Sequence, residues 1–209
     1  LGHAQLSVRK PTAEPERQAD LSRLLAGLPE TRARSSAELV WRGYAEVLPP
    51  PCSLADLKLG ARMLRSTLLH RHSRRCLREC RDFELSSEGC ARRLTSLPAL
   101  PEHTHWPGGT RAEAEESYRL FYELELHHLR AARVTRVDQG RGAAEVTALL
   151  PAGRAPEFHD EFALLDLGEA FVRAGFALDL GQFEAFRIDA EGCAWLAHPR
   201  GLLGRMRAE

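Results

Sequence analysis

Residues 110–150, TRAEAEESYRLFYELELHHLRAARVTRVDQGRGAAEVTALL, decide the fold class because a helical pattern changes there into an alternating one. Thr110 and Glu113 have the spacing of a capping box, which predicts that a helix begins directly after Thr110. Further acids at Glu115 and Glu116 favour the same start because they complement the positive end of the helix dipole. The predicted apolar face of this helix consists of Ala114, Tyr118, Phe121, Leu124 and His128.

The residues after this helix alternate between apolar and polar over 132–136 and again over 144–150. The segment 138–142 between the two runs is rich in turn-forming residues. This pattern is typical of an antiparallel hairpin, so we expect two strands here.

The pattern toward the C-terminus predicts another helix and further strands. Asp160 and Gly175 occupy the N-cap and C-cap positions of an apolar-periodic segment. Alternation resumes over 176–180, and Phe186 and Ile188 precede a turn at 189–192 with Trp195 on the return strand. A mixture of helices and short antiparallel strands is therefore predicted for this region.

Helical patterns dominate the residues before position 98. Short amphipathic helices are predicted at 16–26, 36–47 and 87–94. Ser53, a good N-cap residue, begins a longer helix that extends as far as Arg81. An apolar stripe runs along this helix at the spacing i, i+4, i+7 and i+11, and consists of Leu57, Ala61, Leu64 and Leu68. Because three leucines at this spacing are costly to expose, Leu57, Leu64 and Leu68 are expected to be buried in the core or beneath a partner protein.

The fold class expected from these patterns is α+β, with a helix-rich N-terminal half and a small antiparallel sheet with helices in the C-terminal half. The domain organisation expected is a flexible arm at 1–15, a helical region at 16–97 and an α+β region at 110–209. The Pro- and Gly-rich stretch 98–109 is interpreted as the connector between the two halves.

The composition excludes a whole-chain electrostatic attraction to nucleic acid or membranes, because 29 basic and 29 acidic residues cancel. Arginine nevertheless outnumbers lysine by 27 to 2, a bias that indicates a GC-rich coding region more than a function. The charge is also unevenly distributed: residues 62–93 hold nine Arg and four acids, whereas 157–191 hold nine acids and two Arg. Either these segments neutralise each other in the fold, or they face separate partners.

Targeting signals are not visible in the sequence. No apolar run approaches the roughly 20 residues that span a bilayer, and residues 1–10 lack the apolar core of a signal peptide. The five cysteines are an odd number in a chain large enough to fold without disulfides. We therefore expect a soluble intracellular protein, in the nucleus or the cytoplasm, without membrane partners.

Two groups of residues invite a metal-site hypothesis. The first consists of His70, His72, Cys76, Cys80 and Cys90. On a helix, His72 and Cys80 would lie about 12 Å apart along the axis, too far to share one ion. The second, which suggests a small metal-dependent hydrolase, consists of His103, His105, His127, His128, His159 and Asp160. No phosphate-binding loop, nucleophile elbow or zinc-protease motif accompanies either group, so no catalytic residue, cofactor or metal is expected.

The remaining functional signal is a row of arginines on the long predicted helix. Its partner-binding residues are expected to be Arg71, Arg74, Arg75 and Arg78, together with Leu57, Leu64 and Leu68. The favoured interpretation is a non-catalytic subunit or adaptor of a multiprotein complex, which binds other protein subunits through amphipathic helices and these arginines. The alternative is a nucleic-acid-binding module that uses the basic segment 62–93, although the only aromatic residue between positions 60 and 93 is Phe83.

Overall fold

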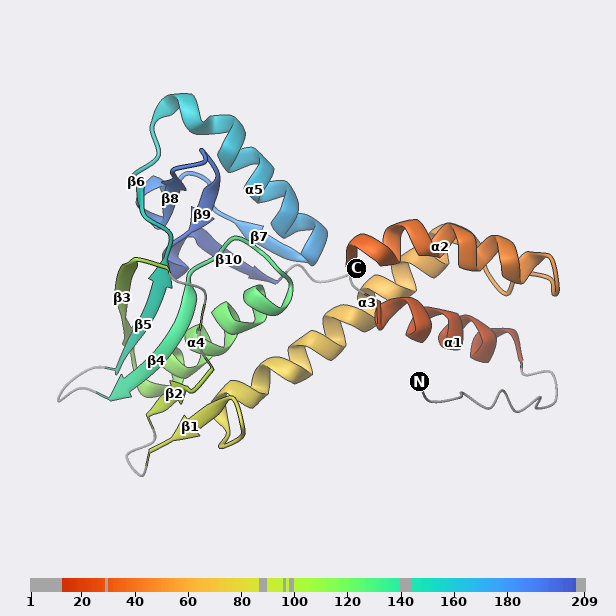
Figure 1. Cartoon of the computed structure of the whole chain (residues 1–209), viewed down its shortest axis with the longest axis horizontal. Coiled ribbons are helices and arrows are strands. Elements are labelled where there is room, and N and C mark those ends of the chain that lie inside the picture. The colour runs from red at the N-terminus through yellow and green to blue at the C-terminus, as the bar shows by residue number, and fades with distance from the viewer. Residues whose placement is uncertain are drawn as a thin grey trace. The chain divides into compact units, whose positions relative to one another are not determined.

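The computed structural model confirms an α+β fold with helices in the N-terminal half and antiparallel sheets with helices in the C-terminal half (Figure 1). The chain divides into two compact units, Leu1–Leu68 and Leu69–Glu209. This division falls within helix α3 and not in the stretch 98–109. The structure describes residues 13–28, 30–86, 90–95, 97, 100–139 and 144–205; the expected arm at 1–15 therefore lies largely outside the described residues.

The first unit is helical. Helices α1 (Glu14–Ala26) and α2 (Glu30–Ala45) correspond to the predicted short helices, although α2 begins earlier than expected. Helix α3 (Leu54–Ser73) follows, with Ser53 Oγ accepting a hydrogen bond from the Asp56 N–H at 3.1 Å. The small core of this unit consists of Leu25, Ala37, Leu57 and Ala61.

The apolar stripe of α3 is buried only at its beginning. Leu57 has no exposed surface, whereas Leu64 is half-buried and Leu68 is 46% exposed. Among the described residues, Ala61 is the last residue of α3 in the core of the first unit. One turn later, Arg65 donates a hydrogen bond to the carbonyl oxygen of Ala26 at 3.3 Å. Leu57 is thus buried in the core and Leu68 is not, and burial of Leu68 beneath a partner protein stays a prediction.

The long helix also ends earlier than predicted. After Ser73 the chain forms a 3-10 turn, η1 (Arg74–Leu77), and Arg78 is extended, so the helix does not reach Arg81. The strands β1 (Phe83–Leu85) and β2 (Ala91–Arg93) follow. The helix predicted at 87–94 is therefore wrong where the structure describes it, because Ala91 pairs with Val137 of a distant strand. Residues 87–89 lie outside the described residues.

The second unit is built around a five-stranded antiparallel sheet in the order β1-β2-β4-β5-β3. Strands β4 (Arg133–Gln139) and β5 (Ala144–Leu150) are the predicted hairpin. Residues 140–143 of its turn lie outside the described residues. The expected connector is a strand over most of its length: β3 (Glu102–Gly109) pairs with β5, and its register shifts between Pro107 and Gly109. Long-range pairing with β5 therefore overrides the local signal of its prolines and glycines.

Helix α4 (Arg111–Leu126) packs against the sheet and begins with the predicted capping box at Thr110 and Glu113. Its apolar residues are buried as expected, and the ring of Phe121 lies 4.8 Å from that of Trp106 on β3. His128 is an exception, because the helix ends at Leu126 and places His128 at the surface with a φ of 58°.

The C-terminal residues form α5 (Glu161–Ala174) and two small sheets. The helix ends at Gly175, whose φ of 88° is the left-handed conformation that its predicted C-cap role requires. One sheet has the order β6-β8-β9 and the other pairs β7 with β10. The elements are η2 (Phe158–Asp160), η3 (Phe183–Ala185), η4 (Pro199–Gly201), β6 (Gly153–Arg154), β7 (Phe176–Leu178), β8 (Phe186–Asp189), β9 (Ala194–Leu196) and β10 (Leu202–Arg205). Strands β8 and β9 confirm the last predicted hairpin. Among the described residues, no helix combines the length and apolar character needed to cross a membrane.

Candidate functional site

The end of α3 and the turn η1 present two chemically different faces. Ser73 and Cys76 face inward and have no exposed surface. The outward face carries four exposed arginines, here named the Arg ridge: Arg71, Arg74, Arg75 and Arg78. The spacing of a helix and a 3-10 turn separates the two sets, so the buried residues on one side hold the backbone that carries the arginines on the other.

Beneath the Arg ridge lies a buried ion-pair network centred on Glu123 of α4, whose side chain has no exposed surface. Arg119 donates to Glu123 Oε2 at 3.1 Å, and Arg205 of β10 forms an ion pair with Oε1. The same Arg119 nitrogen lies 3.1 Å from Ser73 Oγ, and His70 Nδ1 lies 3.2 Å from Glu123 Oε2. The network therefore joins the end of α3 to α4 and to the last strand.

Arg119 also bridges the network to the surface. It donates to both carboxylate oxygens of Glu116, one turn earlier on α4, and this contact pulls the pKa of Glu116 below its usual value. Two guanidinium groups, Arg119 and Arg205, thus share one buried carboxylate. A buried charge surrounded in this way is stable only while all of its partners are present.

His70 is predicted to make the second unit less stable in mild acid. Burial, followed by the nearby guanidinium groups of Arg205, Arg119 and Arg74, lowers the pKa of His70 below its ordinary value of 6.5, and Glu116 opposes this shift. As pH falls below about 6.5, His70 becomes protonated in the unfolded chain, whereas in the folded chain it becomes protonated only at lower pH. The unfolded chain therefore binds more protons, and the free energy of unfolding decreases.

Urea unfolding measured between neutral and mildly acidic pH tests this expectation. The His70→Gln variant should show a shallower loss of stability on acidification than the wild type. The matched control is His72→Gln, which removes an exposed histidine from the same helix. An equally steep loss in His70→Gln and the wild type would exclude His70 as the source.

The histidines and cysteines at 70–90 do not form a metal site in the described structure. No three ligand atoms from His70, His72, Cys76, Cys80 and Cys90 come together among the described residues. Burial raises the pKa of the Cys76 thiol to about 12, which keeps it protonated and unreactive at neutral pH. Cys76 therefore acts as a small core residue.

The histidines of the hydrolase hypothesis are also dispersed. His103 and His105 are exposed on β3, in a strand and not in the expected loop, while His127 is buried against Phe176. Asp160 accepts two hydrogen bonds from Arg154, at 2.6 and 2.9 Å, and one from the Glu157 N–H. The hydrogen bonds from Arg154 are the main reason that the pKa of Asp160 falls to about 2. This carboxylate belongs to the capping box of η2, the turn directly before α5. The Asp160 side chain does not cap α5 itself, although Asp160 occupies the predicted N-cap position.

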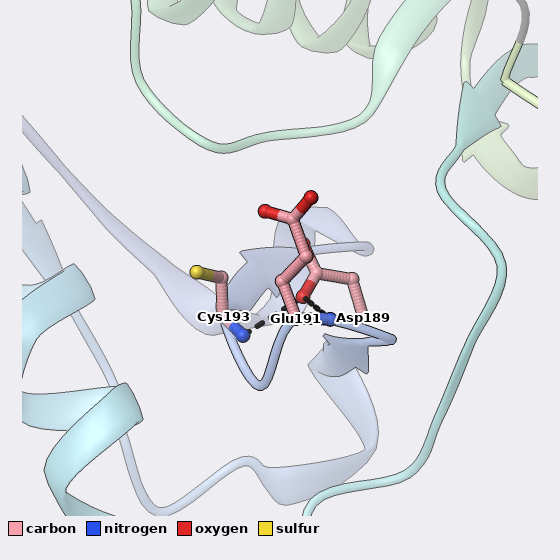
Figure 2. Close-up of side chains that lie close together, drawn as sticks. All are labelled: Asp189, Glu191 and Cys193. Carbon is pink, nitrogen blue, oxygen red and sulfur yellow. Dashed lines mark hydrogen bonds between the residues drawn. The ribbon is translucent and has the colours of Figure 1, made fainter.

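One group of three ligand-type side chains does lie close together in the described residues: Asp189, Glu191 and Cys193 (Figure 2). Both Asp189 oxygens already accept hydrogen bonds, Oδ1 from the N–H groups of Glu191 and Cys193 and Oδ2 from the indole of Trp195 at 2.8 Å. Burial raises the pKa of Asp189, but these hydrogen bonds outweigh it and leave the pKa below its usual value. The geometry is that of a side chain that stabilises the turn between β8 and β9.

The Arg ridge has no acidic partner among the described residues. None of its four guanidinium groups lies within ion-pair distance of a carboxylate there. The acidic segment 157–191 instead pairs with arginines outside the basic segment, in Arg130–Asp166, Arg154–Asp160 and Arg173–Glu169. Within the described second unit the two segments therefore do not neutralise each other.

The spacing of the arginines predicts the Arg ridge, but no sequence pattern predicts the network beneath it. Arg119 and Glu123 have the i, i+4 spacing of an ordinary surface ion pair, so their burial has no local signature. Arg205 reaches Glu123 only through the tertiary fold. A usable hint was that apolar residues flank both positions, because Tyr118, Tyr122 and Leu124 are neighbours in sequence.

Comparisons of the chain with protein-family models, with curated proteins and with solved structures gave no significant match. Function is therefore inferred from the geometry and charge of the chain itself.

Proposed function

We propose that this protein is a non-catalytic subunit of a multiprotein complex that binds an acidic protein surface through the Arg ridge. The observation that carries the proposal is the exposure of four guanidinium groups that have no carboxylate partner among the described residues. The buried ion-pair network holds their backbone in one conformation. A row of arginines on a fixed backbone suits bidentate contacts with carboxylates, because only the side chains have to be ordered when the partner binds.

An acidic protein fits this surface better than a nucleic acid for two reasons. Phe83, the only aromatic side chain near the ridge in sequence, is 1% exposed and lies in the core, where it cannot stack on a base. Glu79 and Glu84 are exposed among the arginines and would repel a continuous phosphate backbone. Of the stripe leucines, Leu64 and Leu68 stay accessible to a partner, whereas Leu57 does not.

Charge reversal on the ridge tests the proposal. In the Arg74→Glu/Arg75→Glu variant, partner recovered by affinity purification from the native source should fall at least tenfold, since juxtaposed like charges cost several kcal/mol, well above the roughly 1.4 kcal/mol that a tenfold change requires. Recovery should be insensitive to nuclease treatment. The matched control, Arg23→Glu/Arg200→Glu, makes the same change of net charge at exposed arginines elsewhere and should retain the partner.

Two outcomes would contradict this function. If nuclease abolishes recovery and each lost arginine lowers the salt slope of oligonucleotide binding by about one, the ridge binds phosphates. If the double variant behaves like the wild type, the ridge is only the solvated face of a helix.

A further inference from the structure

The outer face of α5 and its preceding turn carries an apolar stripe that nothing in the described structure covers. The stripe consists of Phe158, Phe162, Leu165 and Val172, which are 89%, 75%, 57% and 52% exposed. The opposite face of the helix supplies Leu164, Leu167 and Phe171 to the core. The helix is therefore apolar on two sides, and only one of them contributes to folding.

The positions in this stripe follow the spacing i, i+4, i+7 and i+14, so they form a single line along the helix. Scattered apolar residues on a surface are ordinary, but two phenylalanines one turn apart and almost fully exposed are not. The exposed Glu169 occupies the i+11 position between Leu165 and Val172, so the apolar line is uninterrupted only from Phe158 to Leu165. Apolar anchors at i, i+4 and i+7 match the groove-and-helix mode of recognition.

The rim of the stripe is acidic. Its exposed carboxylates are Glu157, Glu161, Asp166 and Glu169. Asp166 and Glu169 pair with Arg130 and Arg173, as described above. Arg154 is held by Asp160 at 2.6 Å and reaches Glu157 only at 3.9 Å.

Glu161 has no ion-pair partner among the described residues. His159, between the two phenylalanines in sequence, lies 3.6 Å from Glu157. At this end of the stripe the three carboxylates of Glu157, Asp160 and Glu161 outnumber the guanidinium group of Arg154 and the imidazole of His159.

We propose that the α5 stripe binds an amphipathic helix of a partner protein that carries Lys or Arg beside its apolar residues. Phe158 and Phe162 are the anchors, and Glu157 and Glu161 select a basic partner. Pairing of α5 with the α5 of a second copy fits less well, because that contact would bring the same carboxylates against Glu157 and Glu161. An anionic lipid surface would be repelled for the same reason.

This inference goes beyond the proposed function, because it assigns a second surface with the opposite charge preference to the Arg ridge. The two surfaces together would let one chain bind an acidic partner and a basic one at separate places.

The test measures binding of the full-length chain to designed helical peptides by fluorescence anisotropy. One probe has a leucine stripe flanked by lysines, and its matched control has the same stripe flanked by glutamates. We expect the lysine probe to bind at least about tenfold more tightly than the glutamate probe, and the preference to shrink with added salt. Phe158→Ser/Phe162→Ser should weaken lysine-probe binding at least about tenfold, since two buried phenyl groups are lost.

Three variants complete the design. Leu39→Ser/Val47→Ser removes exposed apolar residues elsewhere and should bind the lysine probe like the wild type. Glu161→Lys should weaken the lysine probe and strengthen the glutamate probe. Arg74→Glu/Arg75→Glu should leave peptide binding unchanged, so a failure here is separate from a failure of the Arg ridge. Because the replaced phenylalanines are exposed, the serine variant should keep the wild-type melting temperature.

Four results would overturn the proposal. The first two are equal binding of both probes and no binding of either probe, and the other two identify a different occupant of the α5 stripe. A wild-type dimer that Phe158→Ser/Phe162→Ser converts to a monomer, without peptide binding, identifies a second copy. Binding to neutral phosphatidylcholine vesicles that is lost in the same variant, without peptide binding, identifies a lipid surface.

Discussion

The Glu123→Ala variant is expected to lose about 3–5 kcal/mol of unfolding free energy, the cost of breaking a buried ion pair on one side. Glu123 is the single carboxylate shared by Arg119 and Arg205, and it also lies beside His70 and Ser73. Its removal leaves the buried Arg119 with only the exposed Glu116 as an ion-pair partner, and it takes away the ion-pair partner of Arg205, whose side chain is 34% exposed. Urea unfolding followed by circular dichroism measures the loss.

Two further variants show that the effect arises from uncompensated burial. Glu116→Gln removes the exposed partner of Arg119 and should cost no more than about 1 kcal/mol. Adding Arg119→Met to Glu123→Ala should recover part of the stability, because the double variant also removes the buried guanidinium group that lost Glu123 as a partner. Equal losses in Glu116→Gln and Glu123→Ala would contradict a central role for Glu123.

The Leu57→Ala variant is expected to destabilise the first unit by about 2–5 kcal/mol, the range for a leucine truncated in a core. Among the residues whose side chains the structure describes, that core has four buried apolar residues, so the loss is a large share of what holds the three helices together. Hydrogen exchange of the α1 and α2 amides should accelerate accordingly.

Leu64→Ala is the matched control for this change. Leu64 lies on the same stripe but is only half-buried and outside the core of the first unit, so its truncation should cost clearly less. Equal acceleration of exchange in both variants would mean that the stripe is uniformly buried.

Local signals predicted the elements whose structure depends on neighbouring residues. The capping box at Thr110, the hairpin of β4 and β5 and the stop of α5 at Gly175 each require only a few adjacent side chains. Strands β2 and β3 were missed because pairing partners far along the chain determine them. Ala91 lies opposite Val137, and Trp106 lies opposite Val146.

The same distinction explains which parts of the candidate site could be predicted. The Arg ridge is visible in the sequence as arginines at i, i+3, i+4 and i+7, although only Arg71 lies in α3 and the other three lie in η1 or directly after it. Its lack of acidic partners depends on where the carboxylates of 157–191 lie in three dimensions, which composition does not reveal. The helical spacing of the α5 stripe is visible in the sequence, but the sequence does not indicate which of the two apolar faces of α5 is buried.

Strand β3 forms one edge of the five-stranded sheet, and its sequence bears on how this protein avoids aggregation. A bare strand edge offers a row of N–H and C=O groups on which another chain can build. Pro107 supplies no N–H, and Gly109, with a φ of 67°, bends the strand where the register shifts. This edge is therefore a poor template for intermolecular strand addition, which keeps the sheet at its native width when the protein is abundant.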